Sequence, residues 1–415
     1  MTFFRNSTKT SIDSPIANIL TNIIRRKPKS QWVIWLMVYS LWFIVAPTAY
    51  ATVDPLSVPN NRFGIHIISP TVDEASAAAS LVNSTGGDWG YVTFVIERKD
   101  KIHDKWQEFF NDLGRRHLIP IVRIATEVKN GAWVKPDPEE AQLWAGFLDT
   151  LNWPIKNRYV VAYNEPNQAL EWGNTVDPID YSKALDKLIT TLKTKNRDFF
   201  VLNGGFDASA PQKLPNFEDE AIFLKEMDQA VPGIFKKLDG WVSHSYPNPG
   251  FVGLPDQTGR GSVATFQWEL NQLKALGVTK DLPVFITETG WKHAEGLQFN
   301  PNFPSANQVN DYYKKAFETI WNDPRIVAVT PFLLTYQQSA FDHFSFQKPN
   351  EGSSSAEFYP QYQTILDLPK ISGQPILPGI PKPKIDLDLT PYQTVRPKLS
   401  NGFLSFLSML LYGYK

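Results

Sequence analysis

The stretch YVVAYNEPN at residues 159–167 is a short apolar run, rich in β-branched and aromatic residues, that ends in the carboxylate of Glu165. The stretch VFITETGW at residues 284–291 has the same form and carries Glu288 at the end of its apolar part. Both runs have the length and composition of buried strands. Two such strands, each ending in a glutamate, predict a pair of carboxylates at the mouth of a parallel barrel.

Outward from these two stretches, the chain alternates between predicted strands and predicted helices. The predicted strands are residues 62–68, 89–96, 119–125, 158–163, 199–203, 240–245, 284–287 and 326–335. The helical patterns are residues 72–84, 105–116, 138–151, 180–195, 219–229, 262–276, 308–321 and 357–366. Eight alternating strand–helix units predict an α/β protein, a (β/α)8 TIM barrel over residues 52–367. A doubly wound sheet is the alternative, but IHIISP at residues 65–70 lacks the glycine-rich turn typical of it.

The two ends of the chain differ from this body. Residues 1–30 are basic, residues 32–46 are apolar, and AYA at residues 49–51 has the small-x-small pattern of a cleavage site. We therefore expect residues 1–51 to be a secretory signal peptide. The alternative is an uncleaved anchor that contacts the membrane through residues 32–51. Either way, we expect the body to lie outside the cytoplasm, secreted or anchored to the membrane.

The C-terminal segment, residues 368–415, opens with a run rich in proline and glycine, which is typical of an extended linker. It ends in an apolar stretch at residues 403–412 that is too short to span a bilayer. A sticky tail, an interfacial segment and an extra packing element all fit this stretch.

Composition excludes several classes of function. The net charge of the 415-residue chain is −1, with no block of like charge in its body, so nothing indicates nucleic acid as a partner. The absence of cysteine excludes disulfides, thiolate catalysis and cysteine-ligated metal centres. The six histidines show no metal-ligand spacing, so we expect no metal and no cofactor. We expect a monomer.

Polar side chains gather at the ends of the predicted strands, where a barrel exposes a common mouth. Burying so many polar groups without partners would be costly, so their convergence indicates a site. For the two histidines of this set, a hydrogen-bonded wall position is as good an interpretation as ligand binding. We interpret Asp207 as a solvated loop charge. The candidates are His66, Arg123, Asn164, Glu165, Asn203, His244, Tyr246, Glu288 and Trp291.

Two carboxylates across a pocket suit the cleavage of a glycosidic bond. One must be protonated to assist the leaving oxygen, and the other must be ionised to attack the anomeric carbon or to activate water. A hydrogen bond from Tyr246, and the charge of Arg123 if it lies close, would keep Glu288 ionised. This assigns the acid role to Glu165.

Three short motifs in order resemble a known group. Asn-Glu-Pro (Asn164, Glu165) follows the fourth strand, His-x-Tyr (His244, Tyr246) lies on the sixth, and Thr-Glu-Thr-Gly-Trp (with Glu288) ends the seventh. This order resembles the retaining (β/α)8 glycoside hydrolases of the cellulase superfamily, the 4/7 enzymes of clan A, over about residues 60–367.

The resemblance implies a glycoside hydrolase that acts on a β-linked sugar or polysaccharide by double displacement. It assigns Glu165 as acid/base and Glu288 as nucleophile. It also implies that Asn164 binds the sugar 2-hydroxyl and that Tyr246 hydrogen-bonds the nucleophile.

The chain departs from the group in two places. Many members carry a tryptophan sugar platform at the end of strand eight, where this chain has PFLLTY at residues 331–336. We therefore expect Tyr336 or Trp291 to take that role. The arginine that the group places beside the nucleophile is matched loosely by Arg123. Two alternatives stay open: a non-catalytic carbohydrate-binding surface protein, and a metal-dependent hydrolase on the same barrel.

Overall fold

The computed structural model describes residues 52–339, 341–349 and 356–379. The predicted signal peptide or anchor at residues 1–51 lies outside these ranges, as do the apolar stretch at residues 403–412 and the linker from residue 380 onward. Within the described ranges, no helix is both long enough and apolar enough to cross a membrane.

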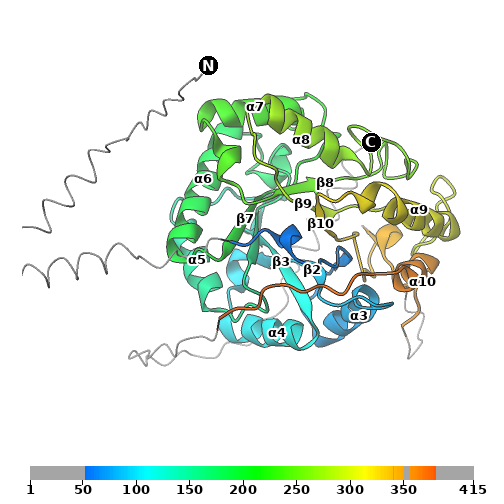
Figure 1. Ribbon diagram of the computed structural model, residues 1–415. Coiled ribbons are helices and arrows are strands. Elements are labelled where there is room, and N and C mark those ends of the chain that lie inside the picture. Colours follow the sequence, from blue (N-terminus) through cyan, green and yellow to red (C-terminus); the bar gives the residue numbers. More distant parts are fainter. Residues whose placement is uncertain (1–51, 340, 350–355, 380–415) are drawn as a thin grey trace, which may run out of the picture. The chain divides into compact units, whose positions relative to one another are not determined.

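Parallel strands form the wall of a barrel in two sheets (Figure 1). Five strands pair in the order β1-β2-β3-β6-β7, and three pair in the order β10-β9-β8. Every predicted strand is present, although the last ends early because Pro331 has no N–H for the ladder. The barrel strands are β1 (Gly64–His66), β2 (Gly90–Glu97), β3 (Leu118–Ala125), β6 (Arg158–Ala162), β7 (Phe199–Asn203), β8 (Trp241–His244), β9 (Val284–Glu288) and β10 (Ile326–Val329).

Helices surround this wall and alternate with its strands (Figure 1). Their inner faces bury large apolar side chains against the strands; Trp106 of α4 and Trp144 of α5, for example, are fully buried. Most of the aromatic residues in the described ranges thus pack the core. The helices are α3 (Val72–Val82), α4 (His103–Arg115), α5 (Glu140–Thr150), α6 (Pro178–Lys195), α7 (Glu220–Ala230), α8 (Thr265–Ala275), α9 (Ala306–Glu318) and α10 (Pro360–Asp367).

The two sheets close on each other at two seams. Between β1 and β10, the Val329 N–H donates to the Arg62 carbonyl at 2.9 Å. Between β7 and β8, the side chain of Asn203 takes the place of the backbone hydrogen bonds that join neighbouring strands elsewhere in the wall. Its Oδ1 accepts from the Val242 N–H at 2.8 Å, and its Nδ2 donates to the Val242 carbonyl at 3.0 Å. The prediction that Asn203 binds substrate is therefore corrected, because its amide is used to close the barrel.

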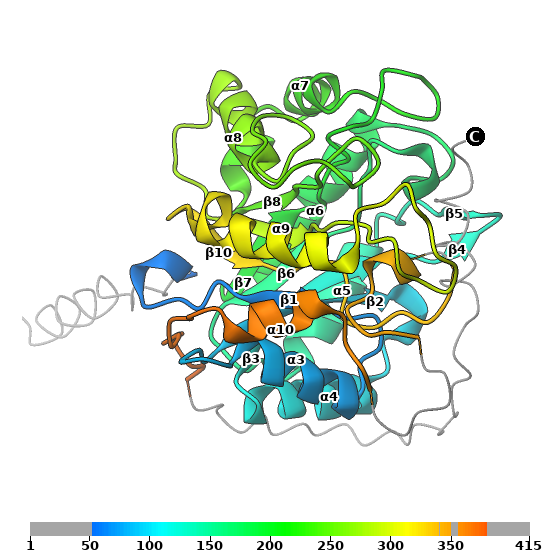
Figure 2. The same ribbon diagram turned by 90° about the vertical axis from the view of Figure 1, so that its right-hand side faces the viewer.

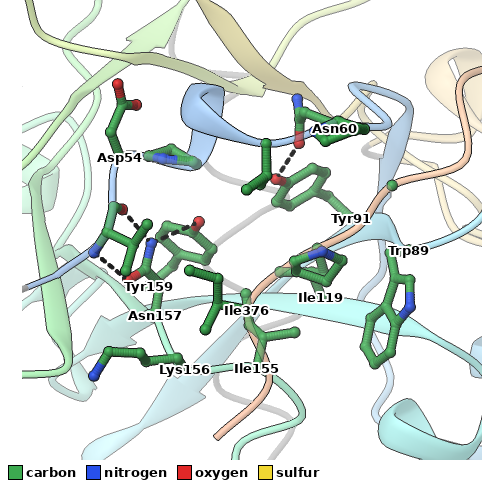
Figure 3. A pocket seen from close by; sticks show the side chains of 16 residues that line it. Asp54, Asn60, Trp89, Tyr91, Ile119, Ile155, Lys156, Asn157, Tyr159 and Ile376 are labelled. Carbon is green, nitrogen blue, oxygen red and sulfur yellow. Dashed lines mark hydrogen bonds between the residues drawn. The ribbon is translucent and has the colours of Figure 1, made fainter.

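The N-terminal end of the barrel is covered by two segments that are far apart in sequence. Figure 3 shows Asn60 of the lead-in accepting a hydrogen bond from the Tyr91 hydroxyl at 2.6 Å. From the other end of the chain, the Ile376 carbonyl accepts from the Lys156 N–H at 2.8 Å. The predicted domain boundary at residue 367 therefore separates segments that are in contact, since residues 368–379 pack along the barrel.

A hairpin that the sequence did not predict follows β3. Its strands are β4 (Val128–Lys129) and β5 (Ala132–Trp133), paired antiparallel. Figure 2 shows the hairpin at the end of the barrel opposite the lead-in. It therefore lies at the C-terminal mouth and brings Trp133 there.

Two carboxylates lie behind β8 and make no ion pair with any described cation. Glu220 begins α7 and Glu269 lies on α8, and both side chains are fully buried. The Trp241 Nε1–H donates to Glu269 Oε2 at 3.1 Å. Burial raises the pKa of Glu269 to about 7. Burial, followed by the charge of Glu269, raises the pKa of Glu220 well above its ordinary value.

This pair predicts that stability depends on pH. Because folding raises both pKa values, the stability that the protonated pair contributes is complete below the ordinary value of 4.5 and is lost as pH rises through about 7. We expect Glu220→Gln to leave the melting temperature near that of the wild type at pH 5 and to raise it by about 3–5 °C at pH 8. Glu226→Gln, on the same helix, is the matched control. Equal shifts at both pH values would contradict a buried carboxyl pair that is protonated in the folded state.

Candidate active site

A cavity of about 960 Å³ lies at the C-terminal mouth of the barrel. Its wall combines polar residues from the strand ends with aromatic residues from the loops. Seven of the predicted site residues line it: His66, Arg123, Asn164, Glu165, His244, Tyr246 and Glu288. The convergence expected from the sequence is thus present for these seven, whereas their contacts with a ligand stay a prediction.

Glu165 lies just after β6, on a backbone turn that few residues adopt. Its φ is 28°, and the φ of Tyr163 is 69°, both in the left-handed region that favours glycine. Such backbone costs free energy and persists only where the surroundings impose it. The Glu165 N–H donates to the Gly205 carbonyl at 2.8 Å, which ties this turn to the loop after β7. The turn carries the carboxylate into the cavity.

Glu288 ends β9 on the other side of the cavity. The Arg123 Nη1–H donates to Glu288 Oε1 at 3.0 Å, and the Tyr246 hydroxyl donates to Oε2 at 3.2 Å. Burial would raise the pKa of Glu288, but the charges of His244 and Arg123 outweigh burial and hold that pKa below its ordinary value. The hydrogen bond from Tyr246 acts in the same direction. Glu288 is therefore the ionised partner. Arg123, which matches the arginine of the glycosidase group only loosely in sequence, contacts Glu288 directly in the structure.

His244 connects the two glutamates. Its Nδ1 lies 2.8 Å from Glu165 Oε1 and 3.9 Å from Glu288 Oε2. Burial would lower the pKa of His244, but the charges of Glu288 and Glu165 outweigh it and raise that pKa. The ring fits here because Gly205 has no side chain. A Cβ at that position would lie 2.2 Å from the His244 ring.

The two glutamates are close enough to act on one bond. Carboxylate oxygens of Glu165 and Glu288 and a ring nitrogen of His244 all lie within 4.8 Å of one another. Three such groups could also hold a metal ion, an arrangement that sequence spacing did not reveal because the three come from different strands. However, the guanidinium of Arg123 already contacts Glu288, and a divalent ion there would face its positive charge.

A second carboxylate accompanies Glu165. The Gln168 Nε2–H donates to Glu165 Oε2 at 2.8 Å and lies 3.2 Å from Asp207 Oδ2. Burial, followed by the charge of Glu165, raises the pKa of Asp207 to about 7. The interpretation of Asp207 as a solvated loop charge is therefore wrong, since the residue lines the cavity. Neither Gln168 nor Asp207 lies in a motif that marks it in the sequence.

His66 lines the cavity and has an unused ring nitrogen. Its Nδ1 lies 3.4 Å from the Thr287 carbonyl, and its Nε2 is buried with no hydrogen-bond partner among the described residues. Burial lowers the pKa of His66 to about 4, so the ring is neutral near pH 7. His66 is therefore a wall histidine of the cavity, and ligand binding through its Nε2 stays a prediction.

Two predicted sugar platforms lie elsewhere. Trp291 is 1% exposed, and its Nε1–H donates to the Gly253 carbonyl at 2.7 Å. The chain turns at Gly290, whose φ is 138°, and this turn sends the Trp291 ring into the core beside Tyr313. Tyr336 is 5% exposed and packs edge-on against Phe341. Neither ring lines the cavity, so both predictions are corrected.

The aromatic residue of the last strand end is Phe332. It follows Pro331, lines the cavity and packs edge-on against His66 with ring centroids 5.2 Å apart. Its place directly after the β10 ladder is the sequence signal that could have identified it. Phe341 and Phe344 extend this aromatic wall.

Known proteins match this chain in structure. No protein-family model matches it, and no curated protein matches its sequence. A GH5_18 protein from Streptomyces cattleya, solved in complex with GlcNAc, is 14% identical with a TM-score of 0.50, over 74% of this chain and 79% of that one. The chain has the (β/α)8 fold of the clan A glycoside hydrolases.

Further structures of this kind match with lower TM-scores. An endo-β-1,4-glucanase from Xanthomonas axonopodis pv. citri is 12% identical with a TM-score of 0.47, over 73% of this chain and 96% of that one. A β-glucosidase from Trichoderma harzianum is 10% identical with a TM-score of 0.47, over 77% and 98%. At these identities the likeness is one of fold, so the chemistry must be argued from the site itself.

Proposed function

We propose that the protein is a retaining glycoside hydrolase that cleaves the O-glycosidic bond of a β-linked sugar by double displacement. The observation that carries the proposal is the pairing of Glu165 and Glu288, whose carboxylate oxygens lie within 4.8 Å. Carboxyl groups of retaining enzymes are about 5–5.5 Å apart, whereas inverting enzymes need about 6.5–9.5 Å to admit a water molecule.

In the first step, an oxygen of Glu288 attacks the anomeric carbon while Glu165 gives its proton to the departing glycosidic oxygen. The anomeric carbon–oxygen bond breaks, and a glycosyl ester on Glu288 forms. Arg123 and Tyr246 keep Glu288 ionised for this attack, and each donates a hydrogen bond to a different oxygen of its carboxylate. A nucleophile held ionised by fixed donors needs no reorganisation at the moment of reaction.

In the second step, Glu165 acts as a base. It takes a proton from a water molecule, whose oxygen attacks the anomeric carbon and releases Glu288. His244, 2.8 Å from Glu165, can as an imidazolium donate a hydrogen bond to that carboxylate while it is ionised, and as a neutral imidazole it can accept one from protonated Glu165. This contact suits a residue that must change its protonation state twice in each cycle.

The stereochemical outcome tests the proposal. We expect proton NMR of an aryl β-glycoside digest to show the β-anomer of the free sugar first, before mutarotation produces the α-anomer. Because the sugar is not assigned, the test uses a panel of gluco-, galacto-, manno- and xylo-configured substrates. First appearance of the α-anomer would show inversion and would contradict the assignment of Glu288 as nucleophile.

A further inference from the structure

Lys292 lines the same cavity on the side of the nucleophile. It follows β9 in the chain, and its N–H donates to the Phe251 carbonyl at 3.1 Å, which holds the residue in place. Its Nζ lies over three aromatic rings, 4.9 Å from the centroid of Phe251, 5.4 Å from Phe303 and 5.7 Å from Phe344. An ammonium group is thus held by aromatic faces at the wall of the cavity.

The charge of Lys292 is not neutralised by the described residues. None of them places a carboxylate within ion-pair distance of its Nζ or accepts a hydrogen bond from it. The other cationic side chains of the cavity wall are engaged, since Arg123 contacts Glu288 at 3.0 Å and Arg260 contacts Asp219 at 2.5 Å. Asp342 acts on Lys292 only through space.

The ring contacts do not satisfy this ammonium group. Cation–π contacts stabilise a charge, but they occupy none of its three N–H donors in a directed hydrogen bond. Burial lowers the pKa of Lys292, a sign that water is partly excluded around it. A partly desolvated ammonium gains most from an anionic acceptor, because charge-assisted hydrogen bonds are roughly twice as strong as neutral ones.

The rest of the cavity would direct an anion to this place. Asp207 and Glu171 lie around Glu165, on the side of the acid/base, and the guanidinium of Arg260 on that wall is already paired with Asp219. On the side of Lys292, the wall is aromatic, with Phe332 and Phe344 able to pack against a sugar ring. Of the acids that line the cavity, the nucleophile lies on this side, and its charge is already balanced by Arg123, whereas Asp342 does not line the cavity.

We propose that Lys292 and its surrounding rings form a subsite for an anionic substituent, so that the substrate is an acidic saccharide carrying a carboxylate or a sulfate. This inference rests on the proposed glycosidase function and narrows its substrate class. A uronic acid and a sulfate ester share the chemistry that Lys292 recognises, and the experiment separates them.

The test compares matched aryl β-glycosides: the glucuronide with the glucoside, the galacturonide with the galactoside, and a 6-sulfated glucoside as the sulfate arm. We expect wild type to prefer at least one anionic substrate over its neutral match. Lys292→Gln should lower that preference in kcat/KM by about 10–100-fold, and Lys292→Arg, which keeps the charge, should retain most of it. An equal loss on neutral and anionic substrates would show a structural lysine and overturn the subsite.

A binding measurement separates this inference from the proposed function. Calorimetry with D-glucuronate, D-glucose and glucose 6-sulfate needs no turnover. If no glycoside is hydrolysed but Lys292→Gln abolishes binding of the anionic sugar, the glycosidase proposal fails and the subsite stands. If hydrolysis proceeds with retention and Lys292→Gln changes neither anion preference nor anion binding, the subsite fails and the glycosidase stands.

Discussion

Replacing Glu288 by alanine is expected to lower kcat on aryl β-glycosides by at least about 10⁴-fold, because no other group can form the glycosyl ester. Arg123 and Tyr246 donate hydrogen bonds to this carboxylate and position it, and neither can replace it. Steady-state kinetics with a chromogenic substrate measure the loss. Glu318→Gln, an exposed change on α9, is the control and should behave as wild type.

Added azide sharpens this result. In Glu288→Ala, a small anion can enter the space left by the carboxylate and attack the anomeric carbon from the same side. The product should be the α-glycosyl azide, formed with inversion in one displacement, while Glu165 still protonates the leaving oxygen. If wild type and Glu288→Ala prove equally inert on the whole substrate panel yet bind sugar equally well, the non-catalytic binding protein is the correct interpretation. Loss of wild-type activity with a chelator would instead favour the metal-dependent alternative.

Replacing Glu165 by alanine is expected to produce a loss that depends on the leaving group. Substrates with poor leaving groups need the proton of Glu165 and should lose about 10²–10⁴-fold in kcat/KM. A dinitrophenyl glycoside leaves without a proton, so its kcat/KM should remain within about tenfold of wild type. The same enzyme preparation tested on both substrates is its own control for folding.

The second step gives an independent check on Glu165. Without the base, the glycosyl ester on Glu288 should accumulate during turnover of the dinitrophenyl glycoside, visible as a burst and as a mass increase of the protein. Azide needs no base, so it should restore turnover and give the β-glycosyl azide, with retention. A uniform loss across leaving groups, with no azide effect, would remove the acid/base role from Glu165.

Much of the barrel could be predicted because its strands and helices are local patterns. The apolar run before Glu165 and its counterpart before Glu288 each read as a buried strand without knowledge of the rest of the chain. The short motifs around these residues also placed Asn164, His244 and Tyr246 at the mouth correctly. Order along the chain sufficed there, because successive parallel strands of a barrel all expose their carboxyl ends at the same face.

The wrong predictions concern residues whose side chains point in a direction that the sequence did not predict. Asn203 and Trp291 lie at or near strand ends, as predicted, and Tyr336 lies in the segment after β10, but their side chains point into a seam or into the core. The direction of a side chain after a strand depends on one or two backbone angles, such as that of Gly290. Composition and periodicity do not report those angles.

The sequence by itself thus determined the α/β barrel, the order of its strands and the place of Glu165 and Glu288 at its mouth, because these depend on local pattern and chain order. Only the tertiary structure decided that Glu165 and Glu288 lie within 4.8 Å, that Arg123 contacts Glu288, and that Phe332 lines the cavity. The position of the Lys292 Nζ over an aromatic ring was likewise visible only in the tertiary structure. The physical reason is that distances and charges at the mouth are set by loops from several strands packing together. The number of residues between two positions in the sequence does not predict how those loops pack.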